Sequence, residues 1–264
     1  KKIIESLNKS SEKRRKRKNS LLELTKDLEK INDLLIQEST EKLQKEHSNP
    51  INRFGKKCFS QSDEDGITIE ILKRLKMGKG FFLELGVGDG TENNSLLLLA
   101  MGWKGIWVGG NDLAVNIKNN NKLRFYKNWI TSDNIIEIIK RGLGDFEKKN
   151  FDLISVDLDG NDYYIVKTIL ELKIFPSVFI LEYNAKFPPP IDFKINYNEN
   201  HKWGNDDYFG CSLVAWNELL DRFGYKLICC NTHTGANCFF VKKKFLSNFK
   251  DVPKEIEKIY SKPR

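Results

Sequence analysis

Short apolar runs alternate with amphipathic stretches from residue 58 onward. The runs have the length and composition of buried strands, and the stretches repeat apolar residues at helical spacing. The predicted strands are 81–85, 105–108, 124–129, 151–156, 178–181, 226–230 and 238–241. The predicted helices lie near 64–76, 92–101, 112–121, 133–142, 163–173, 211–223 and 253–260. The repeated strand–helix–strand order predicts an α/β fold with a mainly parallel seven-stranded sheet and helices on both faces.

The segment between the last two predicted strands, 231–235, has no room for a helix. These strands are therefore expected to form a C-terminal antiparallel hairpin. A second irregular segment, 186–203, begins with a run of three prolines and shows no clear period. We expect it to lie over the carboxyl edge of the sheet, where open parallel sheets bind ligands.

Residues 1–48 contain neither Pro nor Gly and read as a helical arm. Asn49-Pro50 ends it, which predicts two domains, an arm at 1–50 and a globular domain at 51–264. A short heptad seam runs along the arm. Its members are Leu21, Leu24, Leu28, Ile31 and Leu35. The seam can pack on the chain's own domain or pair with a second subunit, and we expect a homodimer through this helix.

The formal net charge of +8 is uneven, because residues 1–50 hold 13 Lys and Arg against nine Asp and Glu. The run 13–18 is entirely basic. It is either a solvated or disordered arm, or a contact for an acidic surface. The five cysteines form no C-x-x-C pair and indicate reduced thiols. No apolar run is long enough to span a bilayer, so a cytoplasmic location is expected.

The stretch FFLELGVGDGTENNS at 81–95 places three glycines directly after a predicted strand. Such a turn brings the backbone close to a ligand. The dinucleotide fingerprint G-x-G-x-x-G fails here, because Thr91 stands where its third glycine should be. A parallel sheet that ends in an antiparallel hairpin is also unlike the dinucleotide-binding domain of a dehydrogenase.

The pattern Glu84-x-Gly86-x-Gly88-x-Gly90 instead resembles motif I of class I S-adenosylmethionine-dependent methyltransferases. Further segments are similar to the FkbM-like group of that family, in the same order along the chain. They are FSQSDEDGITIEIL (59–72), SVDLDGNDYYIVKTIL (155–170), FILEYNAKFPP (179–189), WGNDDYFGCSL (203–213) and GANCFFV (235–241). The resemblance covers about residues 54–245. It implies a Rossmann-like fold and O-methylation of a carbohydrate or related metabolite, in surface-polysaccharide assembly for example, with a phosphate-type oxygen as another acceptor.

The resemblance also implies which residues bind S-adenosylmethionine. The cofactor-binding set is Gln61, Glu84, Gly86, Gly88, Asp89, Gly90, Asn94 and Asp157, with Ser132 and Asp133 at the adenine. One departure concerns the acid that holds the ribose hydroxyls at the end of the second strand. Gly109 stands at that position, and Asn111 or Asp112 is left to take this role.

Asp157 and Glu182 close two strands that are expected to be neighbours, and Asn184 follows two residues later. Two carboxylates and an amide suit a hard cation such as Mg²⁺, which would hold an acceptor hydroxyl and lower its pKa. The alternative is that Glu182 caps a helix or pairs with a lysine. Asp159 lies in the following turn and is expected to face the same site. These four residues are predicted to be catalytic together with His233.

Two histidines lie in loops near the predicted site, His201 in the long segment and His233 at the hairpin tip. Each is either a surface histidine or a general base for the acceptor, and we favour His233 as the base. The long segment and the residues just after it also carry aromatic rings that suit a sugar or internal packing. These are Tyr197, Trp203, Tyr208 and Phe209.

Two other functions remain open at this point. The loss of the ribose acid at Gly109 favours a non-catalytic scaffold that assembles a complex through the arm. The basic arm suggests an RNA methyltransferase, although acidic groups at the expected acceptor site disfavour a polyanion there. We expect a small-molecule or glycan acceptor and no nucleic acid.

Overall fold

The computed structural model describes residues 20, 23–25, 27–28, 31, 34–117 and 121–263. The chain divides into two compact units, Lys1–Leu43 and Gln44–Arg264. The described residues of the first unit are helical, including four of the five seam positions. The fifth position, Leu21, and the basic run 13–18 lie outside the described residues. Pairing through the arm stays a prediction.

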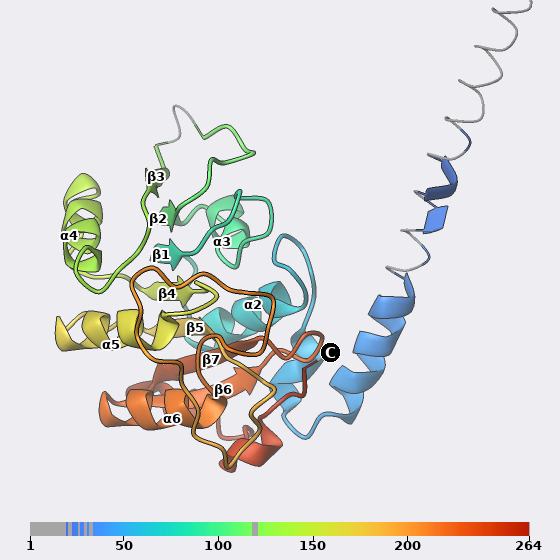
Figure 1. Ribbon diagram of the computed structural model, residues 1–264. Helices are drawn as coiled ribbons and strands as arrows, with labels where there is room; N and C mark the ends of the chain where they lie inside the picture. The colour runs from blue at the N-terminus through green and yellow to red at the C-terminus, as the bar shows by residue number, and fades with distance from the viewer. Residues whose placement is uncertain are drawn as a thin grey trace, which may run out of the picture. The chain divides into compact units, whose positions relative to one another are not determined.

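The second unit contains a seven-stranded sheet with the order β3-β2-β1-β4-β5-β7-β6 (Figure 1). β7 is antiparallel to both of its neighbours, and the other pairs are parallel. The bounds are β1 Phe81–Leu85, β2 Lys104–Gly109, β3 Leu123–Lys127, β4 Leu153–Val156, β5 Val178–Glu182, β6 Tyr225–Cys230 and β7 Asn237–Lys242. The predicted parallel sheet with a C-terminal antiparallel hairpin is confirmed, and the order of the first five strands is Rossmann-like.

Helices cover both faces of the sheet, as predicted (Figure 1). One face carries α4 Ile135–Asp145, α5 Asp162–Glu171 and α6 Leu213–Arg222. The other carries α2 Glu64–Arg74, α3 Leu96–Ala100 and the 3₁₀ turns η1 Pro50–Phe54 and η2 Lys243–Asn248. Alternate residues of β1 serve the two cores: Phe81 packs with the first group, and Phe82 packs with the second. β1 and β4 are buried along their whole length, which explains their unbroken apolar sequences.

The predicted helix at 112–121 is wrong for its described residues, because 112–117 form bends and irregular chain. Four of the ten residues at 112–121 are asparagine, which favours turns over helix. The segment is instead tied to the glycine loop, since the Ala114 amide donates to the Asp89 carbonyl over 2.7 Å. The predicted helix at 253–260 is reduced to the 3₁₀ turn η3, Ile256–Lys258.

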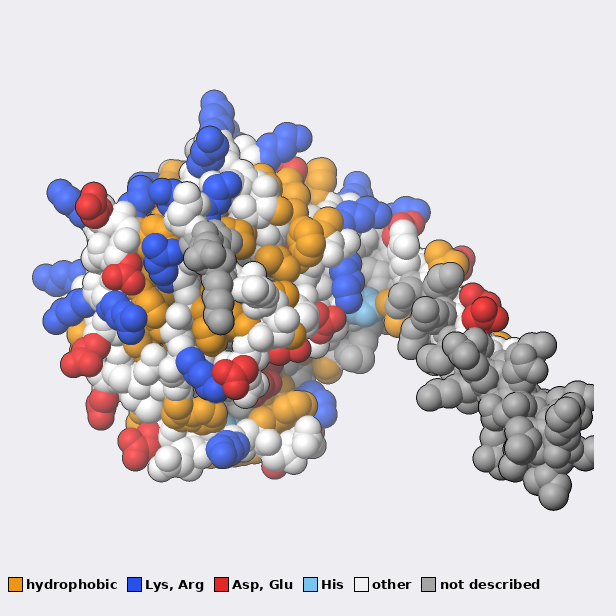
Figure 2. Space-filling view, turned by 90° about the horizontal axis from the view of Figure 1, so that it is seen from above, with side chains coloured by type: hydrophobic (Ala, Val, Ile, Leu, Met, Phe, Trp, Pro, Cys, Tyr) orange, Lys and Arg blue, Asp and Glu red, His pale blue; other side chains and the backbone are white. Residues whose placement is uncertain are grey.

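No helix in the described part of the chain has both the length and the apolar character needed to cross a membrane. On the face in Figure 2, Lys and Arg side chains are scattered among acidic and hydrophobic ones. That face therefore presents no continuous basic surface.

Candidate functional site

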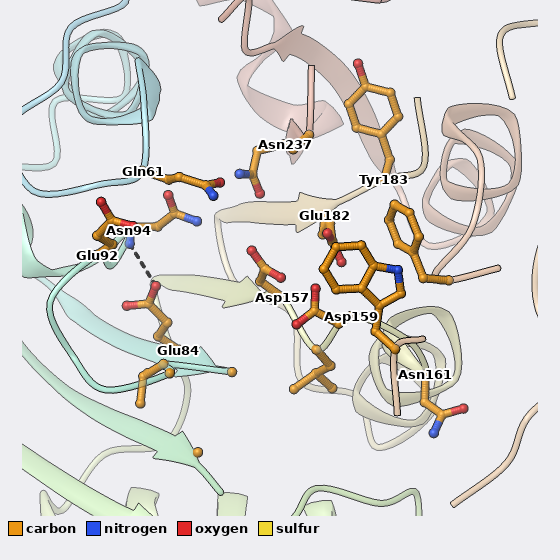
Figure 3. A pocket seen from close by; sticks show the side chains of 18 of the residues that line it. Gln61, Glu84, Glu92, Asn94, Asp157, Asp159, Asn161, Glu182, Tyr183 and Asn237 are labelled. Atoms are coloured by element: carbon orange, nitrogen blue, oxygen red, sulfur yellow. Dashed lines mark hydrogen bonds between the residues drawn. The ribbon is translucent and has the colours of Figure 1, made fainter. Parts of the chain in front are cut away.

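A cavity of about 750 Å³ opens at the carboxyl edge of the parallel strands (Figure 3). It is lined by the loops that follow β1, β2, β3, β4 and β5, by the start of β7 and by the segment 186–210. Its size is that of a typical ligand site. Eleven of the predicted site residues line it: Gln61, Glu84, Gly86, Gly88, Asp89, Asn94, Asn111, Asp157, Asp159, Glu182 and Asn184. The others, Gly90, Asp112, Ser132, Asp133 and His233, are absent from the lining.

The three loop glycines have backbone φ angles of +89°, +53° and +85° at Gly86, Gly88 and Gly90. A Cβ at Gly86 would lie 1.5 Å from the Asp157 carbonyl oxygen, so this glycine lets β1 and β4 approach each other. A Cβ at Gly90 would crowd Leu113, whereas one at Gly88 would enter open space beside the cavity. Gly88 is therefore the position at which a side chain would take up ligand volume.

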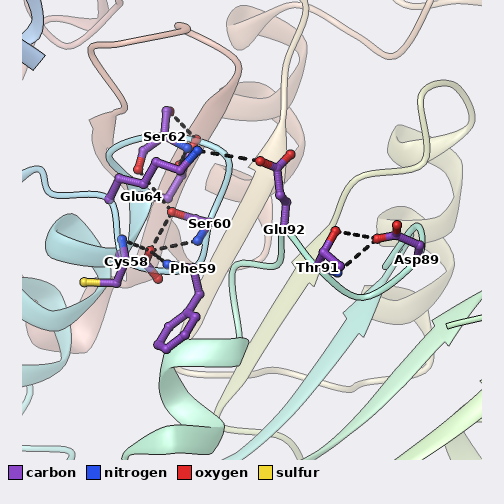
Figure 4. Close-up of polar contacts among 10 residues, drawn as sticks. Cys58, Phe59, Ser60, Ser62, Glu64, Asp89, Thr91 and Glu92 are labelled. Atoms are coloured by element: carbon purple, nitrogen blue, oxygen red, sulfur yellow. Dashed lines mark hydrogen bonds and ion pairs between the residues drawn. The ribbon is translucent and has the colours of Figure 1, made fainter. Parts of the chain in front are cut away.

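Glu84 holds the loop together from beneath the cavity. Its carboxylate accepts hydrogen bonds from the amides of Asn94 (2.8 Å) and Ser95 (3.1 Å) and from the Ser95 hydroxyl. Burial raises the pKa of Glu84, and these hydrogen bonds oppose the rise. Asp89 is engaged likewise, by the amide and hydroxyl of Thr91 (Figure 4). The carboxylates of this loop are thus already partnered within the chain.

The end of β2 explains why the expected ribose acid is missing. A Cβ at Gly109 would lie 3.0 Å from a methyl carbon of Val87, so the loop leaves little room for any side chain there. Asn111 lines the cavity, whereas Asp112 is exposed and pairs with Lys127 at 2.7 Å. Of the two proposed substitutes, only Asn111 is in position to meet a ligand.

Ser132 and Asp133 lie just beyond the cavity wall. The residues that line it after β3 are Asn128, Trp129 and Ile130. The Ser132 amide donates to the Tyr197 hydroxyl over 3.1 Å, which ties this loop to the segment above it. The loop after β3 therefore lines the cavity with residues that lie two to five positions before Ser132 and Asp133, which the resemblance implies for the adenine.

The carboxyl ends of β4 and β5 bring three acids together. Carboxylate oxygens of Asp157, Asp159 and Glu182 all lie within 4.8 Å of one another (Figure 3). Burial raises the pKa of each of the three, and neighbouring carboxylates add to the rise at Asp157 and Glu182. Oε2 of Glu182 is buried and has no hydrogen-bond partner among the described residues. Carboxylates that lie this close together are stabilised when they bind protons or a cation.

Asp159 reaches this cluster through a left-handed backbone with φ of +52°. Asp162 holds the turn in place, because its two carboxylate oxygens accept from the amides of Leu158 (2.8 Å) and Gly160 (2.9 Å). Burial raises the pKa of Asp162 to about 6. A left-handed non-glycine residue beside two acids is the kind of strain that accumulates at functional sites.

Asn184 has a structural part besides the one predicted. Its amide nitrogen donates to the carbonyls of Asp207 (2.9 Å) and Phe209 (3.2 Å), and its amide oxygen accepts from the Lys186 amide (3.2 Å). Both ends of this buried side chain therefore hold the segment 186–210. Asn184 also lines the cavity, and its role as a ligand of a cation stays a prediction.

The two loop histidines are separated by the fold. His201 lines the cavity, and its Nε2 atom is buried with no hydrogen-bond partner in the described part of the chain. Its ring sits against Gly160, where a Cβ would lie 2.3 Å from the imidazole. His233 is outside the lining, and its amide donates to Asp63 over 3.2 Å. The geometry thus favours His201 over our preferred His233.

Aromatic side chains line the same cavity as the acids. Trp203 and Phe209 both line the cavity, with ring centroids 5.9 Å apart and planes inclined by 66°. Trp129 lines it too, and its indole nitrogen donates to the Glu199 carbonyl over 2.8 Å. Tyr197 and Tyr208 lie outside the lining, where their hydroxyls accept from backbone amides.

Sequence reasoning missed Asn128, Trp129, Asn161, Lys186 and Asn237, which also line the cavity. Lys186 is the sole Lys or Arg of that lining within the described residues, and it pairs with Asp207. Asn237 could have been found from the hairpin, because its position at the start of β7 pairs it with Glu182.

No family model matches the chain, and no curated protein matches it either. Several solved structures resemble part of the chain at low identity and with TM-scores below 0.5. The MycE methyltransferase from the mycinamycin biosynthetic pathway, in complex with Mg, SAH and mycinamycin VI, is 13% identical with a TM-score of 0.42 over 66% of this chain. The match covers 48% of that chain, so the present chain spans about half the length of MycE.

Two further structures have the same TM-score of 0.42. The Burkholderia thailandensis 1,6-didemethyltoxoflavin-N1-methyltransferase is 13% identical, over 66% of this chain and 75% of that one. The Methanococcus jannaschii fibrillarin pre-rRNA processing protein is 11% identical, over 63% and 67%. The likeness is one of fold alone and assigns no role to any residue.

Proposed function

We propose that the chain is an S-adenosylmethionine-dependent O-methyltransferase that acts on a carbohydrate or a related hydroxylated metabolite. The observation that carries the proposal is one cavity that joins a glycine loop after β1 to an acidic cluster after β4 and β5. The first is suited to a cofactor with an amino-acid end, and the second to the proton that O-methylation must remove.

The cofactor end of the cavity fits S-adenosylmethionine in its space and its donors. Gly88 leaves the wall free of a side chain, and the backbone of the loop lies along the lining. Asn111 would hold the ribose, and Trp129 with Asn128 would flank the adenine. The bound cofactor supplies an electrophilic methyl group, so the protein's task is to orient the acceptor oxygen and take its proton.

The acidic end fits a divalent cation such as Mg²⁺. Asp157, Asp159 and Glu182 offer hard oxygen ligands within 4.8 Å of one another, and the unpartnered Oε2 of Glu182 needs a positive charge or a donor. A cation held by these residues would lower the pKa of an acceptor hydroxyl. Nε2 of His201, buried at the same cavity, would receive the proton.

The proposed acceptor class rests on the aromatic and acidic side chains that line the cavity together. Trp203 and Phe209 present apolar faces, against which the C–H face of a sugar ring would pack. The acids of the same cavity would meet its hydroxyls. The resemblance of the motifs extends the proposal to surface-polysaccharide assembly, with a phosphate-type oxygen as the other candidate acceptor.

Two alternatives have a specific observation behind them. Packing of Gly109 against Val87 removes the ribose acid, which favours a binding protein without activity. The basic arm suggested an RNA substrate, but the acidic cluster would repel phosphates at the acceptor end.

The proposal is tested by methyl transfer from radiolabelled S-adenosylmethionine to monosaccharides, sugar nucleotides, sugar phosphates and RNA, with and without Mg²⁺. We expect label in at least one sugar with wild-type protein and none with Asp157→Asn. Transfer to RNA alone would favour the RNA alternative, and transfer to nothing in the panel would favour the binding protein.

A further inference from the structure

The start of β7 presents a buried polar atom that nothing in the chain satisfies. Asn237 is 3% exposed and lines the cavity. Its amide oxygen Oδ1 is buried and has no hydrogen-bond partner among the described residues. Its backbone is paired, because its amide donates to Oδ1 of Asn231 and its carbonyl accepts from the Asn231 amide, each over 2.9 Å. Oδ1 is the atom of this side chain that lacks any partner among the described residues, and it is open to a ligand.

The orientation of this amide is set by Glu64. Nδ2 of Asn237 donates to Oε1 of Glu64 over 3.2 Å. Glu64 is fully buried and also accepts from the amide of Ser62 (2.8 Å), the hydroxyl of Ser62 (3.0 Å) and Nδ2 of Asn231 (2.9 Å). Figure 4 shows the pair of Ser62 and Glu64. Turning the Asn237 amide over would press its oxygen against the Glu64 carboxylate, so Oδ1 stays turned away from Glu64.

The sheet register places Asn237 at the acceptor end. Asn237 pairs with Glu182 in the ladder between β5 and β7, and paired residues carry their side chains on the same face of a sheet. In the strand order, β4 and β5 separate β7 from β1 and its glycine loop. Figure 3 shows Asn237, Glu182 and Asp157 around one space.

An amide oxygen accepts hydrogen bonds and cannot donate them, so the group that meets it must carry a hydrogen. A bare phosphate or carboxylate oxygen would leave it unpaired. An unpaired buried acceptor is costly, and a site built around one rejects analogues that lack the matching hydroxyl.

We propose that Asn237 is a specificity-determining residue, whose Oδ1 accepts a hydrogen bond from a hydroxyl of the sugar acceptor, and that Glu64 positions it. The inference rests on the proposed function, because it names the group of that acceptor that the cavity reads. The hydroxyl is recognised beside Glu182, while the ring packs against Trp203 and Phe209.

The test measures binding of methyl glycosides of glucose, galactose, mannose and N-acetylglucosamine to the full chain, with and without S-adenosylhomocysteine. We expect one of them to bind, and one of its monodeoxy analogues to bind about tenfold more weakly. In Asn237→Leu the parent glycoside should weaken by the same factor, and loss of that hydroxyl should then have no further effect. Affinity for S-adenosylhomocysteine should stay within about twofold of wild type.

A second variant and a positioning variant complete the test. Asn237→Thr suits a strand and also removes the amide oxygen, so it replaces the leucine variant if that one does not fold. Glu64→Gln keeps the shape but offers a donor to either side of the Asn237 amide. It should reduce the discrimination between parent and deoxy glycoside to about twofold or less without changing affinity for S-adenosylhomocysteine.

Three results would overturn the inference. These are no binding of any glycoside, full discrimination in both Asn237 variants, or weaker binding of S-adenosylhomocysteine in them, which would make Asn237 a cofactor contact. Failure of the proposed function is seen separately, as no binding of S-adenosylhomocysteine to wild type. The glycoside measurements made without it still test Asn237 in that case.

Discussion

The two ends of the cavity satisfy their polar groups in opposite ways. At the glycine-loop end, the carboxylates of Glu84 and Asp89 accept hydrogen bonds from the loop itself. At the far end, buried atoms of Glu182, His201 and Asn237 have no partner in the described residues. The glycine-loop end is completed mostly by backbone and glycine, apart from the buried Oδ1 of Asn93, and we call it the finished end. The other, the unfinished end, is a set of side chains that need a ligand. Substitutions that alter the backbone should therefore be most harmful at the first end. Substitutions that alter a polar side chain should be most harmful at the second.

The largest expected effect is at the finished end. In Gly86→Ala, the Cβ would meet the Asp157 carbonyl at 1.5 Å on a backbone of positive φ. We expect a loss of roughly 3 kcal/mol or more of unfolding free energy, measured by urea denaturation. Gly144→Ala is the matched control, because its Cβ meets no atom within 4 Å on the exposed side of α4. It should be neutral or stabilising by about 0.5–1 kcal/mol, and equal losses in the two variants would contradict the geometry.

At the unfinished end, Asp157→Asn should lower kcat/KM by roughly a thousandfold while leaving the protein folded. Activity should fall because the variant removes one of the three clustered carboxylates. The protein should stay folded because the change relieves repulsion among the acids. Activity is measured with whichever acceptor the wild type uses, and folding is checked by thermal melting. Near-normal turnover would remove Asp157 from the site.

The two histidines offer a smaller and more discriminating comparison. His201→Gln should lower kcat by about a hundredfold with unchanged affinity for S-adenosylhomocysteine, because Nε2 of this cavity-lining histidine is buried and has no hydrogen-bond partner among the described residues. His233→Gln, outside the lining, should change kcat by less than about threefold. The reverse ranking would restore the prediction made from sequence.

The smallest expected effect is the change of the melting temperature with pH. Because folding raises the pKa of Asp157, Asp159, Asp162 and Glu182, the folded state binds more protons than the unfolded chain. Without metal, the melting temperature should fall as pH rises from the ordinary carboxyl range near about 4 through about 6, the folded pKa of Asp162, and beyond. Mg²⁺ should reverse the fall, and Glu182→Gln should flatten it. A melting temperature that rises over this window would contradict the sign.

The sequence predicted the finished end better than the unfinished one. All seven strands were located, because buried parallel strands and a short hairpin leave strong local signals. The acids Asp157 and Glu182 followed from their places at strand ends. The helix expected at 112–121 was wrong for its described residues, because asparagines in this stretch outweighed the apolar spacing. The roles of Asn184 and His201 stay predictions, because their surroundings depend on how the segment 186–210 folds back, which no local period encodes.

The measurement that tests the central claim most directly is calorimetric titration of the full chain with S-adenosylhomocysteine, with NAD as the control ligand. Wild type should bind one equivalent of S-adenosylhomocysteine and no NAD. Gly88→Ala, which adds a methyl group beside the open cavity, should weaken this binding by about tenfold or more without unfolding the protein. No binding to wild type would contradict the claim, because a cavity that ignores the cofactor product cannot belong to a methyltransferase, and the fold would then serve as a scaffold.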